Sequence, residues 1–432
     1  MKITACFSTN SIDCQAAVEK MTRAMQLSEG QKCGSFTVPG GSIGYVTSSE
    51  RFSSIPFLRE AENGSVLMIS GVPIDLHGHL DSRLQEILTS DFHKAQKSLH
   101  SLDGAFAALF WDAQNQKLVI VTDCLGIQPL YIARPDGLLL LATELKAFPA
   151  SGLVDVEMDP AGWGAFVSPG FNIADHTQLA GVKLVDSATI LVYDPAAGSL
   201  ESKTHWSWPE PKPEMKMADV DTAEMLRIMQ CEIECYASHC RSGTILLSGG
   251  FDSRLILTLL RRLNMDCKVL VLTHPEHGFG VDGKFAVRIA KRLGCRDIEM
   301  GFPARDYYSS PSYFRYIVID EVAIPSMVLY MSTHVSEHIK PEMKAVWEGA
   351  WGRDLLLPLL IRFPADLRPI FKTGATTLNR CSGRSPCPFF LIPSAMPCTK
   401  PSGRFWSAKW ANTPMTISAP QGFRWQTRCV DI

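Results

Sequence analysis

The stretch ILLSGGFDSRL, residues 245–255, decides the fold of the second half of this chain. Three apolar residues run into Ser248-Gly249-Gly250, and an apolar pattern resumes only after Arg254. The pattern predicts a strand, a tight turn and a helix, as in many α/β proteins. Because the first N–H groups of a helix have no partner within it, the same turn also predicts a pocket for pyrophosphate.

The segments around this loop alternate between helix and strand patterns. Asp221 and Glu224 resemble a capping box that opens a helix reaching to about Tyr236. After the loop come a helix, a strand, a helix and a strand, in the segments DSRLILTLLRRLN, CKVLVLT, GKFAVRIAKRLG and RDIEMG. Apolar strands separated by helices predict an α/β doubly wound parallel sheet with helices on both faces.

The first half, up to about residue 205, has a different pattern of short apolar runs broken by turn residues. GAFAALFWD and KLVIVTD are separated by AQNQ, while YIA and LLLLAT are separated by RPDG, so both pairs predict antiparallel hairpins. We therefore expect an α+β N-terminal domain, built as an antiparallel β-sandwich with a few helices.

Proline and charge patterns place the domain boundaries. WSWPEPKPEMK has three prolines within five positions and predicts a linker over 206–218, between domains at 1–205 and 219–370. From Phe371 to Ile432 there are eight Lys or Arg, one acidic residue and seven prolines, without a sustained period. This irregular basic tail is either disordered or the product of a shifted reading frame.

Composition excludes several classes of function. The chain has 432 residues, 46% apolar and 20% charged, with a formal net charge of −2, which predicts several buried cores and no nucleic-acid partner. No segment is apolar enough to span or enter a membrane, and the N-terminus lacks a secretion signal, so we expect a cytoplasmic protein. The 13 cysteines are expected to be reduced thiols, and a homodimer is compatible with the sequence.

The loop at 248 carries the predicted chemistry. Gly249 and Gly250 allow backbone N–H groups to approach an oxyanion, Ser248 and Ser253 add hydroxyl donors, and Asp252 offers a hard oxygen ligand for Mg²⁺. The chain contains no GxxxxGK[ST] loop for γ-phosphoryl transfer. The Ser-Gly-Gly-x-Asp-Ser pattern instead resembles the pyrophosphate loop of enzymes that cleave ATP between its α and β phosphates.

A second segment widens that resemblance. SLDGAFAALFWDAQNQKLVIVTDCLGIQPLYIARPDGLLLLATELKAF, residues 101–148, resembles the glutaminase-domain core of the asparagine synthetase family. The family pattern is LxGxFAFALWD…RDxxGxxPLYY…FASExKA, and the synthetase loop follows at the expected distance. Roughly residues 60–360 are covered. The resemblance implies an N-terminal nucleophile hydrolase-like domain followed by an ATP-pyrophosphatase domain.

The resemblance also implies a set of ATP and Mg²⁺ ligands. The pyrophosphate and nucleotide contacts would come from Leu246, Ser248, Gly249, Gly250, Asp252, Ser253, Leu272, Thr273 and Gly349. EGAWGRDLLL, residues 348–357, matches the family's second acidic loop if one residue is inserted, which makes Asp354 and Asp252 the catalytic carboxylates that hold Mg²⁺. Without that insertion Arg353 takes the place and the role is lost, and Glu348 is the acid that could compensate.

The amidotransferase half departs from the family where glutamine would react. Family members that hydrolyse glutamine carry a cysteine directly after the initiator methionine, whereas this sequence has Lys2, and Cys6 lies inside a predicted strand. Ser70-Gly71-Val72 replaces the family's Asn-Gly-Glu, while Asp123 keeps an acidic position. Ser70, Gly71 and Asp123 thus form a vestigial glutamine site, and we expect no glutaminase activity.

These features together predict an ATP-dependent amide-bond-forming ligase. It would activate a small-molecule or peptide carboxylate, by default aspartate, as an adenylate, and an amine donor would attack it with release of AMP and pyrophosphate. One alternative is an intramolecular amide former resembling β-lactam synthetase or lasso-peptide cyclase, since the glutaminase nucleophile is missing. The other is a catalytically degenerate or truncated paralogue.

Overall fold

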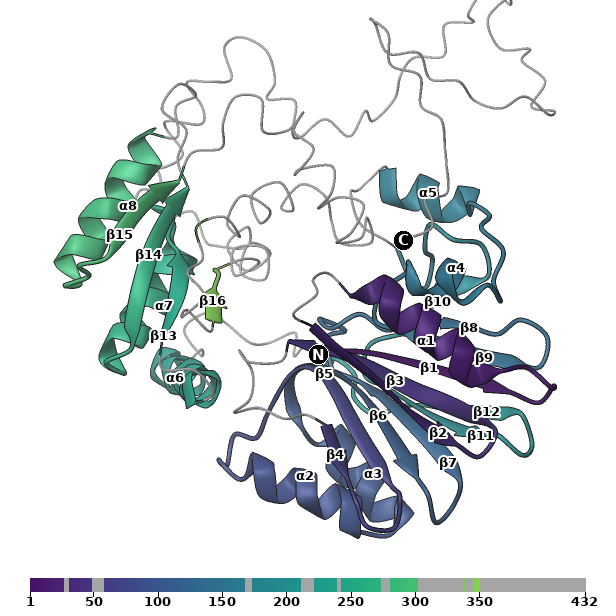
Figure 1. Ribbon diagram of the computed structural model, residues 1–432. Coiled ribbons are helices and arrows are strands. Elements are labelled where there is room, and N and C mark those ends of the chain that lie inside the picture. The colour runs from purple at the N-terminus through teal and green to yellow at the C-terminus, as the bar shows by residue number, and fades with distance from the viewer. Residues whose placement is uncertain are drawn as a thin grey trace, which may run out of the picture. The chain divides into compact units, whose positions relative to one another are not determined.

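The computed structural model describes residues 1–26, 31–48, 58–167, 173–210, 221–238, 242–272, 280–301, 338 and 345–349. The predicted tail at 371–432 and much of the predicted linker therefore lie outside the described residues. Among the described residues, no helix is long and apolar enough to cross a membrane. The N-terminal region and the parallel-sheet region are described separately below (Figure 1).

Two six-stranded antiparallel sheets form the N-terminal region, as its alternating apolar runs predicted. The first sheet has the order β10-β8-β9-β1-β3-β2, made of β1 (Lys2–Ser8), β2 (Gln31–Val38), β3 (Gly41–Ser48), β8 (Tyr131–Ala133), β9 (Leu138–Ala142) and β10 (Val182–Leu184). The second has the order β12-β11-β7-β6-β5-β4, made of β4 (Leu58–Glu60), β5 (Val66–Ile74), β6 (Asp103–Asp112), β7 (Lys117–Thr122), β11 (Thr189–Asp194) and β12 (Ser199–Thr204). The two predicted hairpins are confirmed as β6–β7 and β8–β9.

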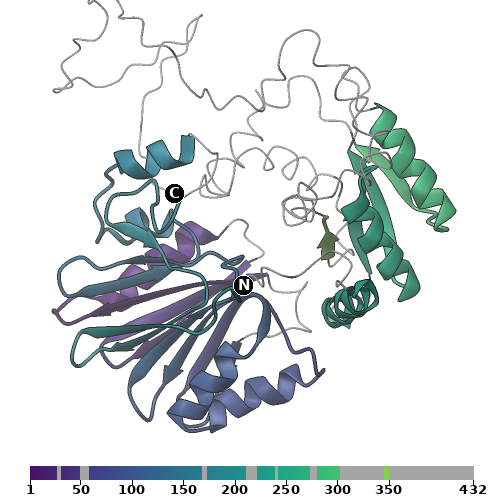
Figure 2. The ribbon, with the colours of Figure 1, turned by 180° about the vertical axis from the view of Figure 1, so that it is seen from behind.

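Helices cover the outer faces of both sheets, which gives four layers (Figures 1 and 2). Helix α1 (Cys14–Met25) packs with α4 (Ala147–Ser151) on the first sheet, and α2 (Leu80–Thr89) packs with α3 (Phe92–His100) on the second. Helix α5 (Pro160–Val167) follows α4 in the chain. This layering explains why β1 is buried on both sides: alternate residues face the other sheet or α1.

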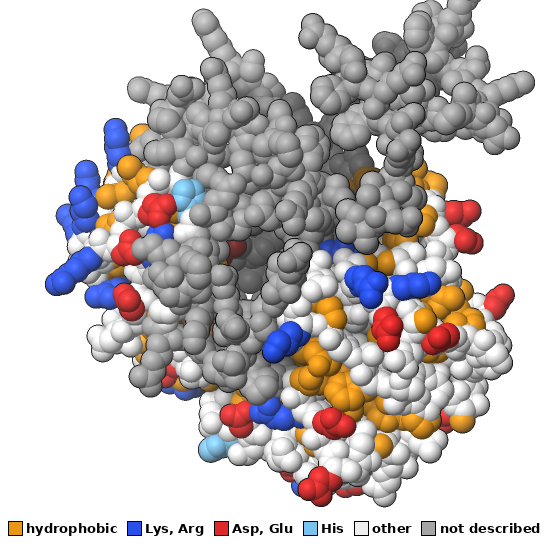
Figure 3. Space-filling view, viewed as in Figure 1, with side chains coloured by type: hydrophobic (Ala, Val, Ile, Leu, Met, Phe, Trp, Pro, Cys, Tyr) orange, Lys and Arg blue, Asp and Glu red, His pale blue; other side chains and the backbone are white. Residues whose placement is uncertain are grey.

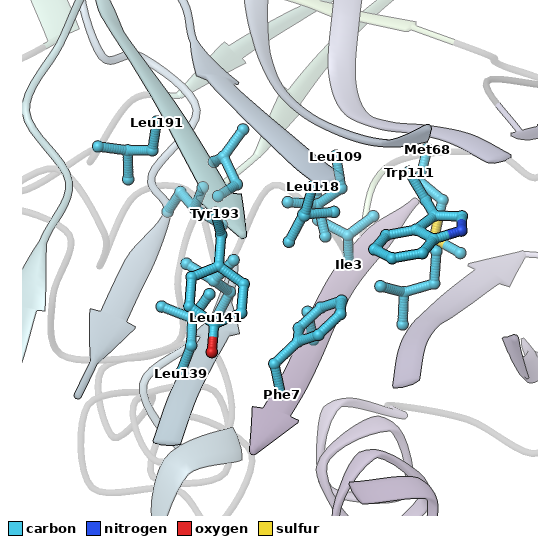
Figure 4. Close-up of a cluster of buried hydrophobic side chains, with 14 of the residues drawn as sticks. Ile3, Phe7, Met68, Leu109, Trp111, Leu118, Leu139, Leu141, Leu191 and Tyr193 are labelled. Atoms are coloured by element: carbon cyan, nitrogen blue, oxygen red, sulfur yellow. The ribbon is translucent and has the colours of Figure 1, made fainter. Parts of the chain in front are cut away.

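The centre of the N-terminal region lies between the two sheets (Figure 4). Phe7 from β1 stacks on Trp111 of β6, with ring centroids 5.8 Å apart, and meets Tyr193 of β11 edge-on at 5.4 Å. All three side chains are nearly fully buried. Such aromatic contacts across the layers lock the two sheets together, beyond the hydrophobic gain from their burial.

The second region is a parallel sheet of four described strands in the order β15-β14-β13-β16. Its strands are β13 (Ser242–Leu246), β14 (Asp266–Leu272), β15 (Ile298–Gly301) and β16 (Ala345–Trp347), and its helices are α6 (Thr222–Ser238), α7 (Phe251–Arg262) and α8 (Gly280–Arg292). All three strand pairs are parallel, so the predicted direction is confirmed. Figure 3 shows Lys and Arg side chains gathered over α8, the solvated face of an amphipathic helix.

Helix α6 begins where the capping pattern placed it. The Asp221 carboxylate accepts hydrogen bonds from the backbone N–H groups of Ala223 and Glu224, at 2.9 and 3.0 Å. The Glu224 side chain bonds Arg227 at 2.6 and 2.7 Å instead of returning to residue 221. Only half of the predicted capping box is therefore present, because the charged pair along the helix competes for the glutamate.

Candidate functional site

The Ser248-Gly249-Gly250 loop joins the carboxyl end of β13 to the first turn of α7. Strand β13 is flanked by β14 and β16, so the loop follows an interior strand of the described sheet. In open parallel sheets this edge, where helix N-termini point at the crevice, is where ligands bind. The loop is not covered, because Ser248 and Gly250 are exposed and Gly249 is half-buried.

Two serine hydroxyls hold the loop in shape. The Ser253 hydroxyl accepts from the Ser248 backbone N–H at 3.2 Å, and the Ser248 hydroxyl accepts from the Gly250 N–H at 3.1 Å. The two hydroxyls are themselves hydrogen-bonded at 3.1 Å. Gly250 caps α7 without a side-chain hydrogen bond to the helix, so the cap residue does not use the first N–H groups of α7. The sequence pattern thus supplies both a rigid loop and an open helix end.

An acid that sequence reasoning did not assign, Asp282 in the first turn of α8, reaches this loop. Its Oδ1 accepts a hydrogen bond of 2.9 Å from the Gly249 backbone N–H. A Cβ on Gly249 would lie only 2.4 Å from that oxygen, so a glycine is what lets the carboxylate approach. A carboxylate therefore occupies a donor that the hypothesis assigns to pyrophosphate.

Arg254 lies against the loop. Its guanidinium donates to the Gly249 carbonyl at 2.8 Å and lies over the Phe251 ring, 4.8 Å from the ring centroid. The Arg254 side chain is therefore held against the loop and does not extend into solvent from its helix. This positive charge stays within the loop's surroundings, where it favours a bound anion.

Gly349 brings the end of β16 against α7. A Cβ at Gly349 would come within 2.4 Å of the Ser253 backbone nitrogen and 2.9 Å of the Asp252 carbonyl carbon. Asp252, Ser253 and Gly349 are therefore neighbours. Next to them, desolvation raises the pKa of the Glu348 carboxyl, although part of this side chain remains exposed.

The structure describes some of the remaining predicted nucleotide ligands and not others. Leu246 and Leu272 are half-buried at the carboxyl ends of β13 and β14, on the loop's side of the sheet. Thr273 and Asp354 lie outside the described residues. The structure therefore describes one of the two carboxylates assigned to Mg²⁺, namely Asp252 in the first turn of α7.

Sequence reasoning also missed a buried charged residue, Lys268, within the strand CKVLVLT. Lys268 is 2% exposed, forms an ion pair with Glu299 of β15, and donates to the His338 carbonyl at 2.8 Å. Glu299 also bonds the His338 ring at 2.5 Å. Lys268 first, and His338 next, hold the pKa of the Glu299 carboxyl below its usual value. A lysine inside an apolar run was the available sequence signal, since such a residue is rarely buried without a partner.

In the N-terminal region the structure brings the vestigial glutamine-site residues together. Ser70 is buried in β5 and donates to the Met1 carbonyl at 2.7 Å, next to the start of β1. Gly71 pairs with Phe106 of β6, and the Phe106 N–H donates to the Asp123 carboxylate at 3.1 Å. Segments that lie far apart in sequence therefore meet around Phe106.

The fold itself explains why a glycine is required at position 71 and an aspartate at position 123. Gly71 has φ +90°, and a Cβ there would lie 2.2 Å from the Ala105 carbonyl oxygen, so only glycine fits. Asp123 is 2% exposed and accepts four backbone N–H groups, from Phe106, Leu125, Ile127 and Gln128, at 3.0 to 3.1 Å. With two donors on each oxygen, this carboxylate holds the turn after β7 in place.

The start of β1 presents no thiol among the described residues. Lys2 forms an ion pair with Glu144 at 2.7 Å and donates to the Met25 carbonyl at 2.7 Å. Cys6 lies fully buried within β1, as expected. A hydrogen bond with the Cys14 thiol, together with burial, raises the pKa of Cys6, which disfavours the nucleophilic thiolate.

Comparisons with known proteins agree with this arrangement. Residues 82–206 match the glutamine amidotransferase domain family. Proteins of Mycobacterium tuberculosis and Mycobacterium bovis named "Putative asparagine synthetase", glutamine-hydrolyzing, are each 26% identical to the chain over 309 residues. The chain is therefore similar to proteins of an asparagine synthetase-like family.

The extent of these matches is limited. The alignment with the mycobacterial relatives covers 69% of this chain and 46% of their length, so the chain spans less than half of those proteins. Among solved structures, the allosteric regulatory enzyme of purine biosynthesis is similar at a TM-score of 0.35 and 12% identity, covering 70% of this chain and 80% of its own.

Proposed function

We propose that this asparagine synthetase-like chain is an ATP-dependent amide-bond-forming ligase. The observation that carries the proposal is the Ser248-Gly249-Gly250 loop after an interior parallel strand, with Asp252 in the helix turn that follows. A glutamine amidotransferase domain match precedes it in the chain, in the order expected for this family. The combination supports ATP cleavage between the α and β phosphates rather than γ-phosphoryl transfer.

The proposed reaction joins a carboxylate to an amine, with aspartate as the default acid. An oxygen of the substrate carboxylate attacks the α-phosphorus of ATP, a new P–O bond forms, and the bond to the bridging oxygen breaks. The leaving pyrophosphate takes that electron pair and is held by the loop's N–H groups and the first turn of α7. The amine donor then attacks the acyl adenylate and AMP departs. The protein contributes positioning and charge neutralisation.

The described residues fit a pyrophosphate better than they define a metal site. Gly250 leaves the first turn of α7 without a side-chain cap, and the two serine hydroxyls fix the loop beside it. Asp252 would hold Mg²⁺ there, with Asp354 as the second proposed ligand. The ion would neutralise charge on the pyrophosphate.

We further propose that the N-terminal domain does not hydrolyse glutamine. Lys2 is engaged with Glu144 at the start of β1, and Val72 replaces the acid expected to bind the glutamine amine. The same observation favours the second candidate, an intramolecular amide former whose amine is already part of the substrate. A catalytically degenerate paralogue is the third, supported by the Asp282 carboxylate on the Gly249 N–H.

Exchange of labelled pyrophosphate into ATP tests the ligase directly, with aspartate and other candidate acids supplied in turn. We expect acid-dependent exchange that is lost in Asp252→Asn and kept in Asp266→Asn, since Asp266 lies at the opposite end of β14. Protein that binds ATP but gives no exchange with any acid would rule out the ligase and favour the degenerate paralogue.

A further inference from the structure

A cavity of about 470 Å³ lies in the N-terminal region between α3 and β12. Lys97 and His100 line it from the helix, and Lys203 and His205 line it from the strand and the residue that follows. Strand β12 is the edge of its sheet among the described strands.

Secondary structure explains why these side chains converge. His93, Lys97 and His100 are spaced four and three residues apart, which puts them on one face of α3. Lys203 pairs with Ile190, whose side chain belongs to the apolar cluster under α2 and α3, so Lys203 stands on the same face of the sheet. Side chains from one face of α3 and from alternate positions of β12 therefore line the same cavity.

The charge in this cavity is predominantly positive. Two lysines line it against one acid, Glu201, so its net charge is +1 with its three histidines neutral, whereas the whole chain counted in the same way has a net charge of −2. The His100 and His205 rings stack with centroids 5.6 Å apart at 29°. Burial first, and then His205, Lys203 and Lys97, lower the pKa of His100. The positive field at His100 thus has sources on both elements.

The end of α3 explains only part of this cluster. Lys97 and His100 lie in the last turn of the helix, where cations offset the negative end of its dipole. Lys203 belongs to β12 and His205 follows it, so the capping of α3 does not explain their place in the cavity. His205 is instead fixed by the contact of its Nε2 with the Thr122 carbonyl at 3.0 Å.

We propose that this cavity is a binding site for a phosphate-bearing anion, held by Lys97 and Lys203 and by the His100–His205 pair. A phosphate monoester carries nearly two negative charges at neutral pH, more than the single charge of a carboxylate, and offers three acceptor oxygens to convergent donors. Bound anion would offset the repulsion between the two imidazoles, so binding and histidine protonation favour each other. The proposal is independent of the ATP site.

Titration of the full chain with inorganic phosphate tests the site, using the ring C–H signals of the histidines in NMR spectra. We expect saturable shifts of His100 and His205 near neutral pH. Sulfate, whose charge is constant in this range, should bind at least about threefold more tightly near pH 6 than near pH 8, because protonated imidazoles add positive charge. Shifts that never saturate, or sulfate binding that ignores pH, would overturn the proposal.

Matched variants separate this site from general charge effects. Lys97→Ala with Lys203→Ala should weaken phosphate binding about tenfold, whereas Glu201→Gln should strengthen it. Lys94→Ala is the control, because Lys94 lies on α3 but pairs with Glu86 at 2.8 Å and does not line the cavity. An equal loss in Lys94→Ala would show that only the overall charge matters, and the site would be withdrawn.

Discussion

At the scale of single residues, the loop's donors are largely occupied by the protein's own oxygens. Ser253, Asp282 and Ser248 accept from the backbone N–H groups of residues 248, 249 and 250, respectively. The two hydroxyls can rotate to donate to an incoming anion, but the carboxylate of Asp282 can only accept. The proposed pyrophosphate would therefore have to displace Asp282 from Gly249.

Asp282→Asn should accordingly bind Mg-ATP more tightly than the unmodified chain. The substitution removes a negative charge from the place assigned to an anion, and such exposed charges contribute on the order of 0.5–1 kcal/mol, or about two- to fivefold in affinity. Calorimetric titration measures the change. Asp266→Asn at the far end of β14 controls for net charge. Unchanged or weaker binding in Asp282→Asn would mean that this acid helps the site instead of competing for it.

The sequence could not predict which residues outside the motif contact the loop, because such contacts depend on tertiary packing. The motif predicted that Ser248, Gly249 and Gly250 form the turn between a strand and a helix, since such a pattern is local. The contact of Asp282 depends on how α8 packs beside α7, which no local pattern encodes. The acidic position of Asp123 could be read from the sequence, but its saturation by four N–H groups could not, because it requires a turn and a neighbouring strand.

At the scale of elements, two glycines near the loop have different tolerances. A Cβ on Gly249 would meet the far end of the Asp282 side chain, which can move, whereas a Cβ on Gly349 would meet the backbone of Ser253 at 2.4 Å. Backbone cannot give way without separating β16 from the start of α7.

Gly349→Ala should therefore weaken ATP binding much more than Gly249→Ala does. We expect a loss of about tenfold or more for Gly349→Ala, because the clash shifts one of the two elements that frame the loop. For Gly249→Ala we expect only a small change, since displacing Asp282 also removes a competing charge. Fluorescence titration with an ATP analogue compares them, and an equal effect would contradict the contacts described here.

Elements with strong periodic patterns were predicted well. The three parallel strand pairs and the helices between them follow from apolar runs of distinct period. Helix α1 has no such explicit prediction, although Asp13 caps it through a hydrogen bond to Ala16. Its short apolar stripe becomes meaningful only against β1, so packing rather than propensity determines it.

At the scale of the whole molecule, the N-terminal region lacks an accessible nucleophile at the described start of β1, where the glutaminase thiol is expected. The N-terminal sandwich keeps the amidotransferase framework, but the described start of β1 offers a lysine in an ion pair where a thiol would act. Cys6 is buried and hydrogen-bonded to Cys14. In the proposed ligase reaction, the nitrogen for the amide would then come from ammonia or from an amine on the substrate.

Glutamate release from glutamine should consequently stay at background in the presence of Mg-ATP and aspartate. Ammonium salts should support AMP formation under the same conditions if aspartate is the acid, because free ammonia can attack the adenylate directly. Treatment with a thiol-alkylating reagent should leave the ammonia-dependent rate unchanged. Glutamine hydrolysis above background that alkylation abolishes would show that a working nucleophile exists elsewhere in the chain.

The central place of β1 in its sheet also governs how the N-terminal region can assemble on the ribosome. β1 lies between β3, which is complete at Ser48, and β9, which begins only at Leu138. One edge of β1 therefore stays unpaired while about 90 more residues are synthesised, which takes roughly 5–20 s. Unpaired edges of this kind recruit other strands. Nascent chains that stall before β9 should thus depend on chaperones, which makes translation speed between these strands a determinant of the yield of folded protein.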